Sequence, residues 1–138
     1  MSKRKDSKDK GNRGERKALE AFRAAGLEVR RYLQYNKSWD DPDLGVIVGD
    51  RELRIEVKNI ELCSDYWFDP EKVAKRESPP STLLKWLGGK EDETPYHAVV
   101  FTKNYKPYMA FYEKDGRHIV TTLEEYAKEL ADEANKLR

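Results

Sequence analysis

Apolar residues recur at helical spacing in the first part of the chain. Asn12, followed three residues later by Glu15, has the form of a capping box, which is typical of a helix start. Gly26 is a suitable helix end, so a helix is predicted over about 12–25. One face of this helix carries the apolar positions Ala18, Leu19, Phe22 and Ala25.

A second helix is predicted near the C-terminus, over about 123–136. Thr122 and Glu125 form another capping box directly before an apolar pattern. The apolar residues return to one side of the helix at Leu123, Tyr126, Ala127, Leu130, Ala134 and Leu137. Both terminal helices therefore have a face that must be buried against another layer.

Between the two helices, short apolar runs predict six strands. Gly49 and Asp50 separate two of these runs and have the composition of a hairpin turn. An order of one helix, three strands, an irregular segment, three strands and one helix favours an α/β or α+β domain, with a mixed central β-sheet flanked by helices. The predicted strands lie at about 27–35, 44–48, 53–57, 97–103, 107–113 and 117–121.

The segment 61–95 interrupts the strand pattern with several prolines and glycines. Short helices are predicted at about 70–76 and 81–87, and a segment of this length in a small domain is often functional. The aromatic run 66–68 could stack on unpaired bases or pack in the core. Trp86 lies among leucines on the second short helix, which is predicted to cover the core or a partner subunit.

Composition narrows the class of protein. A chain of 138 residues is long enough for one domain with its own core, and its single cysteine, Cys63, excludes a disulfide framework within one chain. The sequence has no apolar run of membrane-spanning length and no signal-peptide pattern, so we expect a soluble, intracellular protein.

Charge is unevenly distributed along the chain. The net charge is only +1, although 38% of residues are charged. Residues 1–17 contain eight basic side chains against three acidic ones. Residues 1–11 are almost without apolar content and are predicted to form a flexible basic arm, followed by a single domain over 12–138. Such an asymmetry indicates one basic face on an otherwise neutral body.

The predicted hairpin places two carboxylates opposite each other. With a two-residue turn at Gly49 and Asp50, Val48 pairs with Arg51, and counting back sets Asp43 across from Glu56. Directly opposed residues have β-carbons about 4.5–5.5 Å apart, where two carboxylates repel unless a cation lies between them. Lys58 lies on the same face. A four-residue turn would keep this face, whereas a three-residue turn would not.

Such a pair suits Mg²⁺, which takes oxygen ligands and keeps several waters. The backbone carbonyl of Val57 could add a further ligand. A bound Mg²⁺ lowers the pKa of its water and neutralises charge on a phosphate oxygen, and Lys58 could orient the water or stabilise developing negative charge. These parts suffice for hydrolysis of a phosphodiester.

The pattern of Pro42-Asp43 followed by Glu56-Val57-Lys58 on the next strand resembles the PD-(D/E)xK nuclease signature. The preceding helix, which bears Glu15 in the run 11–16, makes the chain similar to the archaeal-type Holliday junction resolvases. The resemblance implies a restriction-endonuclease-like fold and an active site of Glu15, Asp43, Glu56 and Lys58. It also implies a homodimer that cuts four-way DNA junctions with Mg²⁺ or Mn²⁺.

In that family an arginine ends the following strand and a serine precedes the aspartate, which implies Arg30 or Arg31, and Ser38, in this chain. We expect the metal to be held by Asp43, Glu56, Val57 and Glu15. The residues predicted to contact DNA are Arg13, Arg16, Lys17, Arg30, Arg31, Lys37 and Ser38. Two alternatives stay open: a restriction-like or repair endonuclease acting on other DNA structures, and a non-catalytic nucleic-acid-binding module.

Overall fold

The structure, a computed structural model, describes residues 3–32, 42–89, 94–103 and 106–137. The side chains of 3–12 are not among those described. The elements in chain order are α1 (Lys3–Ala24), β1 (Glu28–Arg31), β2 (Leu44–Val48), β3 (Arg51–Asn59), the 3₁₀ helix η1 (Asp65–Phe68), α2 (Pro70–Lys75), α3 (Ser81–Gly88), β4 (Ala98–Thr102), β5 (Met109–Lys114), β6 (Arg117–Thr122) and α4 (Leu123–Lys136).

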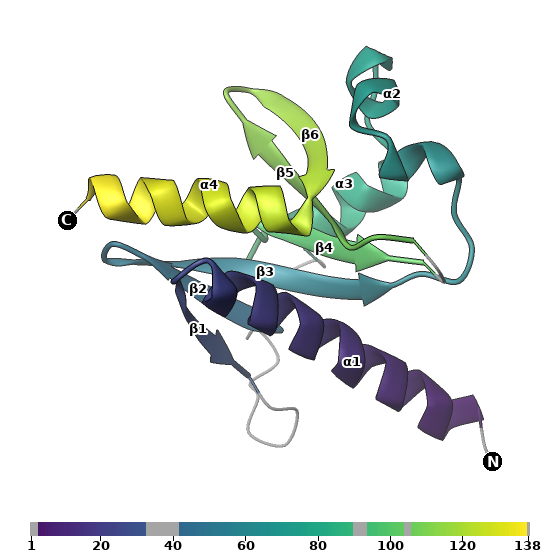
Figure 1. Ribbon diagram of the computed structural model, residues 1–138. Helices are drawn as coiled ribbons and strands as arrows, with labels where there is room; N and C mark the ends of the chain where they lie inside the picture. The colour runs from purple at the N-terminus through teal and green to yellow at the C-terminus, as the bar shows by residue number, and fades with distance from the viewer. Residues whose placement is uncertain (1–2, 33–41, 90–93, 104–105, 138) are drawn as a thin grey trace.

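The six strands that the structure describes belong to one mixed sheet in the order β1-β2-β3-β4-β5-β6 (Figure 1). Four neighbouring pairs are antiparallel, and β3 and β4 are parallel. The parallel pair requires a crossover, which the segment with η1, α2 and α3 supplies. The mixed central sheet flanked by helices that the sequence predicts is therefore confirmed.

Successive side chains along each strand point to opposite faces of the sheet, so the interior consists of two cores, one on each face. On β3, Leu53 and Ile55 point into the core that α1 and α4 cover. On β4, Val99 and Phe101 point into the opposite core, which α2 and α3 cover. Because β3 alternates in the same way, its residues 54, 56 and 58 lie on the face of the sheet where α3 packs.

Helix α1 begins nine residues before the predicted start. The prediction that Asn12 caps this helix is wrong, because helix runs from Lys3 through Asn12, and the stretch 3–11 that we interpreted as a flexible arm is helical. The sequence contains the physical reason. Opposite charges recur four residues apart at Lys5 and Asp9, and again at Asp9 and Arg13, a spacing that stabilises helices even without an apolar face.

The C-terminal helix follows its prediction closely. Helix α4 spans Leu123–Lys136, and the Thr122 hydroxyl oxygen accepts a hydrogen bond from the Glu125 N–H at 3.2 Å. Burial of one face against α1 and the sheet then holds the helix in place, with Phe22 of α1 against Tyr126 of α4. Within the described part of the chain, no helix has the length and apolar character needed to cross a membrane.

This cap gives a stability prediction. Thr122→Ala removes the side-chain acceptor at the start of α4 and is expected to lower the free energy of unfolding by about 1 kcal/mol. Urea unfolding followed by circular dichroism measures the change. Thr122→Ser keeps an acceptor oxygen and should retain most of the stability. Equal losses in the two variants would show that the methyl group matters and the cap does not.

Candidate active site

The β2–β3 hairpin sets the register of the acidic pair. Gly49 adopts a positive φ of 65° in the turn, and Val48 pairs with Arg51 while Leu44 pairs with Ile55. These pairs confirm the two-residue turn, and the next position along the ladder places Asp43 beside Glu56. The Oδ2 atom of Asp43 accepts a hydrogen bond from the Val57 N–H at 2.9 Å, which fixes this carboxylate at the start of β2.

The two carboxylates perturb each other. The pKa of Glu56 is raised to about 7, first by burial of the side chain and then by a hydrogen bond with Asp43 and the charge of Asp43. A hydrogen bond from Tyr96 and the charge of Lys58 act in the opposite direction. Only 17% of the Glu56 side chain is exposed. At neutral pH the pair therefore either shares a proton or requires a cation.

The predicted lysine is present at the pair. Nζ of Lys58 lies 3.9 Å from Oε1 of Glu56, and 38% of the lysine side chain is exposed. The same Nζ lies 5.5 Å from the centroid of the Trp86 ring. A partly exposed ammonium beside two carboxylates is accessible to a phosphate that approaches from solvent, and it can stabilise negative charge there.

Glu15 is placed differently from the other predicted acidic residues. Its Oε2 accepts hydrogen bonds from Nε and Nη2 of Arg31 at 3.3 and 3.2 Å, and both side chains are about three-quarters buried. No three histidine, cysteine, aspartate or glutamate side chains gather into a possible metal site among the residues that the structure describes. The geometry supports a two-carboxylate site, and the prediction of Glu15 as a metal ligand gains no support from it.

The position of Glu15 follows from how α1 meets the sheet. Gly14 is buried, and a β-carbon there would lie 3.4 Å from Cγ1 of Val57. Gly14 therefore lies where α1 packs on β3, on the face that also carries Ile55 and Val57. Glu56 and Lys58 point to the other face, so Glu15 reaches Arg31 at the end of β1.

The donor set of Asp43 and Glu56 fits a divalent cation. Carboxylate oxygens are the ligands that Mg²⁺ prefers. Burial first, and then the neighbouring Asp43, raise the pKa of Glu56, and a bound cation would favour the ionised form of this carboxyl group. Val57, also predicted as a ligand, contributes its N–H to Asp43, and the role of its carbonyl stays a prediction.

Solved structures of known proteins include chains that resemble this fold. The fold is similar to the 1.6 Å structure of Hjc from Archaeoglobus fulgidus, a Holliday junction resolvase from an archaeal hyperthermophile. The TM-score is 0.44 and the sequences are 21% identical, with 88% of this chain and 99% of the other chain covered. No family model and no curated protein matches the sequence.

The described residues among those predicted to bind DNA lie on α1 and β1. Arg13, Arg16 and Lys17 are exposed on α1. The Arg30 side chain on β1 is 63% exposed, and its Nη1 lies 3.9 Å from Oε2 of Glu52. Arg31 instead makes the largely buried ion pair with Glu15. Lys37 and Ser38 lie outside the described residues, so their predicted role is unchanged.

Two aromatic residues at the site were missed by sequence reasoning. Tyr96 lies two residues before β4, is buried, and hydrogen-bonds Glu56. The ring of Trp86 faces the Lys58 ammonium. The sequence predicts that the helix with Trp86 covers the core or a partner subunit, and it gives Tyr96 no role. No local pattern links residues 86 and 96 to β3, because the contact arises from the parallel pairing of β3 with β4.

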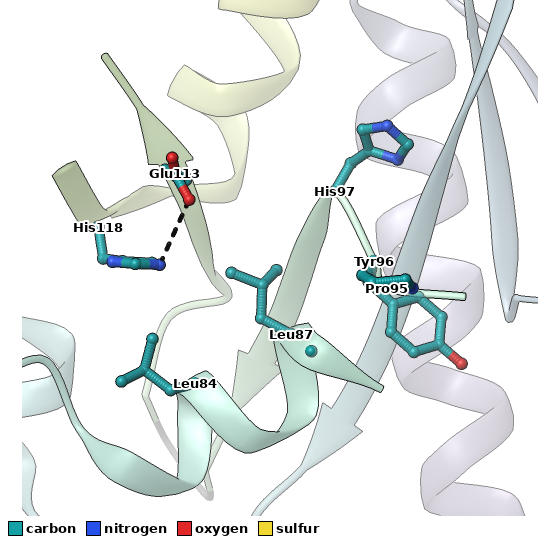
Figure 2. Close-up of a pocket in the computed structure, with 8 residues that line it drawn as sticks. Leu84, Leu87, Pro95, Tyr96, His97, Glu113 and His118 are labelled. Carbon is teal, nitrogen blue, oxygen red and sulfur yellow. Dashed lines mark ion pairs between the residues drawn. The ribbon is translucent and has the colours of Figure 1, made fainter. Parts of the chain in front are cut away.

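Tyr96 also borders a pocket on the α3 side of the sheet. The pocket holds about 360 Å³ and is lined by Leu84, Leu87, Gly88, Pro95, Tyr96, His97, Glu113 and His118. Figure 2 shows Glu113 and His118 on one side of Leu84 and Leu87, with Pro95 and Tyr96 on the other. Both histidines have structural partners, since Nδ1 of His97 accepts from the Arg54 N–H and Nε2 of His118 lies 3.7 Å from Glu113.

The aromatic run that could have stacked on bases is partly buried and packs against the core on the α2 and α3 side of the sheet. Trp67 and Phe68 both contact the ring of Phe101, at centroid distances of 6.3 and 5.2 Å. Tyr66 receives the guanidinium of Arg76 over its ring at 3.8 Å. These contacts favour the packing alternative for residues 66–68, because each ring already has a partner in the fold.

Proposed function

We propose that this protein is a divalent-metal-dependent endonuclease that cuts branched DNA, with the four-way junction as its substrate. One observation carries the proposal. Asp43 and Glu56 face each other across the β2–β3 hairpin with Lys58 beside them, and burial holds the pKa of Glu56 at about 7. A protein that only bound DNA would gain nothing from two opposed carboxylates next to a surface that must attract phosphates.

Each residue of the site would have a separate role in the proposed reaction. Asp43 and Glu56 would hold the Mg²⁺, which when bound lowers the pKa of a water and neutralises charge on a phosphate oxygen. The Val57 N–H orients Asp43, and Tyr96 orients Glu56. The ammonium of Lys58 orients the attacking water or stabilises the negative charge that develops on the phosphate.

Exposed basic residues provide the contacts that place the DNA. Arg13, Arg16 and Lys17 on α1 and Arg30 on β1 would contact phosphates, which fixes position without reading sequence. Lys37 and Ser38, in the stretch of chain between β1 and Asp43, would contribute to the same surface. Arg31 would act mainly through Glu15, because its guanidinium is already engaged there.

Junction cutting by paired nicks implies a homodimer. A four-way junction is close to two-fold symmetric, and an isologous dimer presents two identical active sites related by the same symmetry. Each subunit would then nick one of two opposed strands. The oligomeric state and the symmetry of the nicks are part of the proposal and are measured together with activity.

The test is a cleavage assay on an end-labelled four-way junction with Mg²⁺, Mn²⁺ or EDTA, beside a linear duplex of the same sequence. Metal-dependent, symmetric nicks on the junction alone are the expected result. Equal cutting of the duplex would replace junction resolution with a restriction-like or repair activity. Tight junction binding without any cutting would replace the enzyme with a binding module.

A further inference from the structure

Lys58 makes a second contact besides its ion pair with Glu56. Its Nζ lies 5.5 Å from the centroid of the Trp86 ring, within the distance of about 6 Å at which an aromatic face attracts a cation. Trp86 belongs to α3, the short helix whose Leu83 and Leu87 are buried in the core on that face. The indole itself is partly buried and packs against the same core, and its ring also faces the lysine ammonium.

A lysine at this position needs such a contact to stay in place. The side chain has four rotatable bonds, and a single ion pair at 3.9 Å, to a lysine that is 38% exposed, contributes little by itself to holding it. Without a second restraint the ammonium would move among several rotamers in solvent. The indole limits these rotamers to those that keep the charge beside the acidic pair.

The α3 segment that carries Trp86 is also connected to Glu56, through Tyr96. The Tyr96 N–H donates to the Leu87 carbonyl at 2.8 Å, which links the end of α3 to the residue that hydrogen-bonds Glu56. The Tyr96 ring also lies 5.1 Å from the guanidinium carbon of Arg54. The α3 helix therefore has a defined position relative to β3, and Trp86 is held at a fixed distance from Lys58.

We propose that Trp86 is a positioning residue that keeps the Lys58 ammonium beside the Asp43–Glu56 pair through a cation–π contact. Its consequence for cleavage rests on the proposed nuclease function, whereas the contact itself does not. Trp86 touches neither metal nor DNA in this role and acts only through Lys58. The competing interpretation is that Trp86 merely packs against the core beside α3.

The contact is tested without reference to activity by NMR of the lysine side chains. Methylene protons above an aromatic face are shielded, so the resonances of Lys58 next to Nζ should move downfield in Trp86→Leu and only in part in Trp86→Phe. Loss of the signal in Lys58→Arg assigns it. Trp67→Phe, which alters an indole that packs on Phe101, should leave it unchanged. An unshifted Lys58 signal in Trp86→Leu would overturn the proposal.

The role of Trp86 in cleavage is tested with a double-mutant cycle on the four-way junction. Trp86→Leu should lower the single-turnover rate roughly two- to fivefold, the effect of losing a cation–π contact at a partly exposed site, with unchanged junction affinity. Trp86→Phe should restore much of the rate. In a Lys58→Met background the same substitution should have no further effect.

The outcomes separate the two proposals. A wild-type protein that cuts no DNA would contradict the nuclease function and leave the NMR result to decide on Trp86. An equal loss of rate from Trp86→Leu with and without Lys58 would show a structural role and would contradict the positioning role. Loss of junction binding in Trp86→Leu would contradict it as well.

Discussion

Asp43→Asn is expected to lower the single-turnover rate of four-way junction cleavage by at least about 10³-fold while junction binding in EDTA is retained. A metal ion contributes several kcal/mol of charge stabilisation to phosphodiester hydrolysis, and about 1.4 kcal/mol corresponds to a tenfold change in rate. The variant removes one of the two charges that would hold the ion. Its amide oxygen can still accept the hydrogen bond from the Val57 N–H, so the hairpin should stay folded.

Asp50→Asn is the matched control for this prediction. Asp50 lies in the turn of the same hairpin, is exposed, and carries the same charge as Asp43. Its substitution should leave cleavage and binding at wild-type levels. Cleavage by Asp43→Asn at the wild-type rate would refute the metal assignment, whereas loss of junction binding by this variant would point to a defect in folding or in DNA contact.

Glu56→Gln is expected to stabilise the metal-free protein at alkaline pH. The pKa of Glu56 is about 7 in the folded protein, raised by burial first and by Asp43 second, against an ordinary value of 4.5. The folded state therefore binds a proton more tightly than the unfolded state between these values. The free energy of unfolding falls as pH rises through this window, by roughly 2–3 kcal/mol.

The measurement is urea unfolding between pH 4.5 and pH 8 in EDTA. Glu56→Gln should flatten the profile and exceed the wild-type stability at pH 8, because the uncharged amide avoids the cost of a buried carboxylate beside Asp43. Mg²⁺ should then stabilise the wild type at pH 8 and leave the variant unchanged. Glu124→Gln, an exposed substitution on α4, controls for the lost charge. If the stability of Glu56→Gln changed with pH as that of the wild type does, burial would not destabilise the charged form of this side chain.

Much of the sheet could be predicted because its signals are local. The apolar runs 44–48 and 53–57 and the Gly49-Asp50 turn between them predict the two strands. They also predict the register if the turn has two residues, which the pairing of Val48 with Arg51 confirms. From that register alone Asp43 faces Glu56, with Lys58 on the same side. Thr122 and Glu125 likewise marked the start of α4, because a cap is made by neighbouring residues.

The start of α1 shows where local signals compete. Asn12 and Glu15 form a capping pattern, yet the helix continues through them to Lys3. A capping sequence stabilises a helix start only if the residues before it do not favour helix themselves. Here opposite charges before Asn12 recur at i, i+4, a spacing that favours helix, so the helix extends beyond the capping pattern.

The sequence by itself determined the strands of the hairpin, the opposition of Asp43 and Glu56, and the terminal helix, because each depends on residues close together in the chain. Tertiary structure alone decided that Glu15 pairs with Arg31 and that Trp86 and Tyr96 contact Lys58 and Glu56. These contacts follow from the docking of α1 on one face of the sheet and from the parallel pairing of β3 with β4 across the α3 segment. Packing between segments that are distant in the sequence determines these contacts, and no local spacing of residues predicts them.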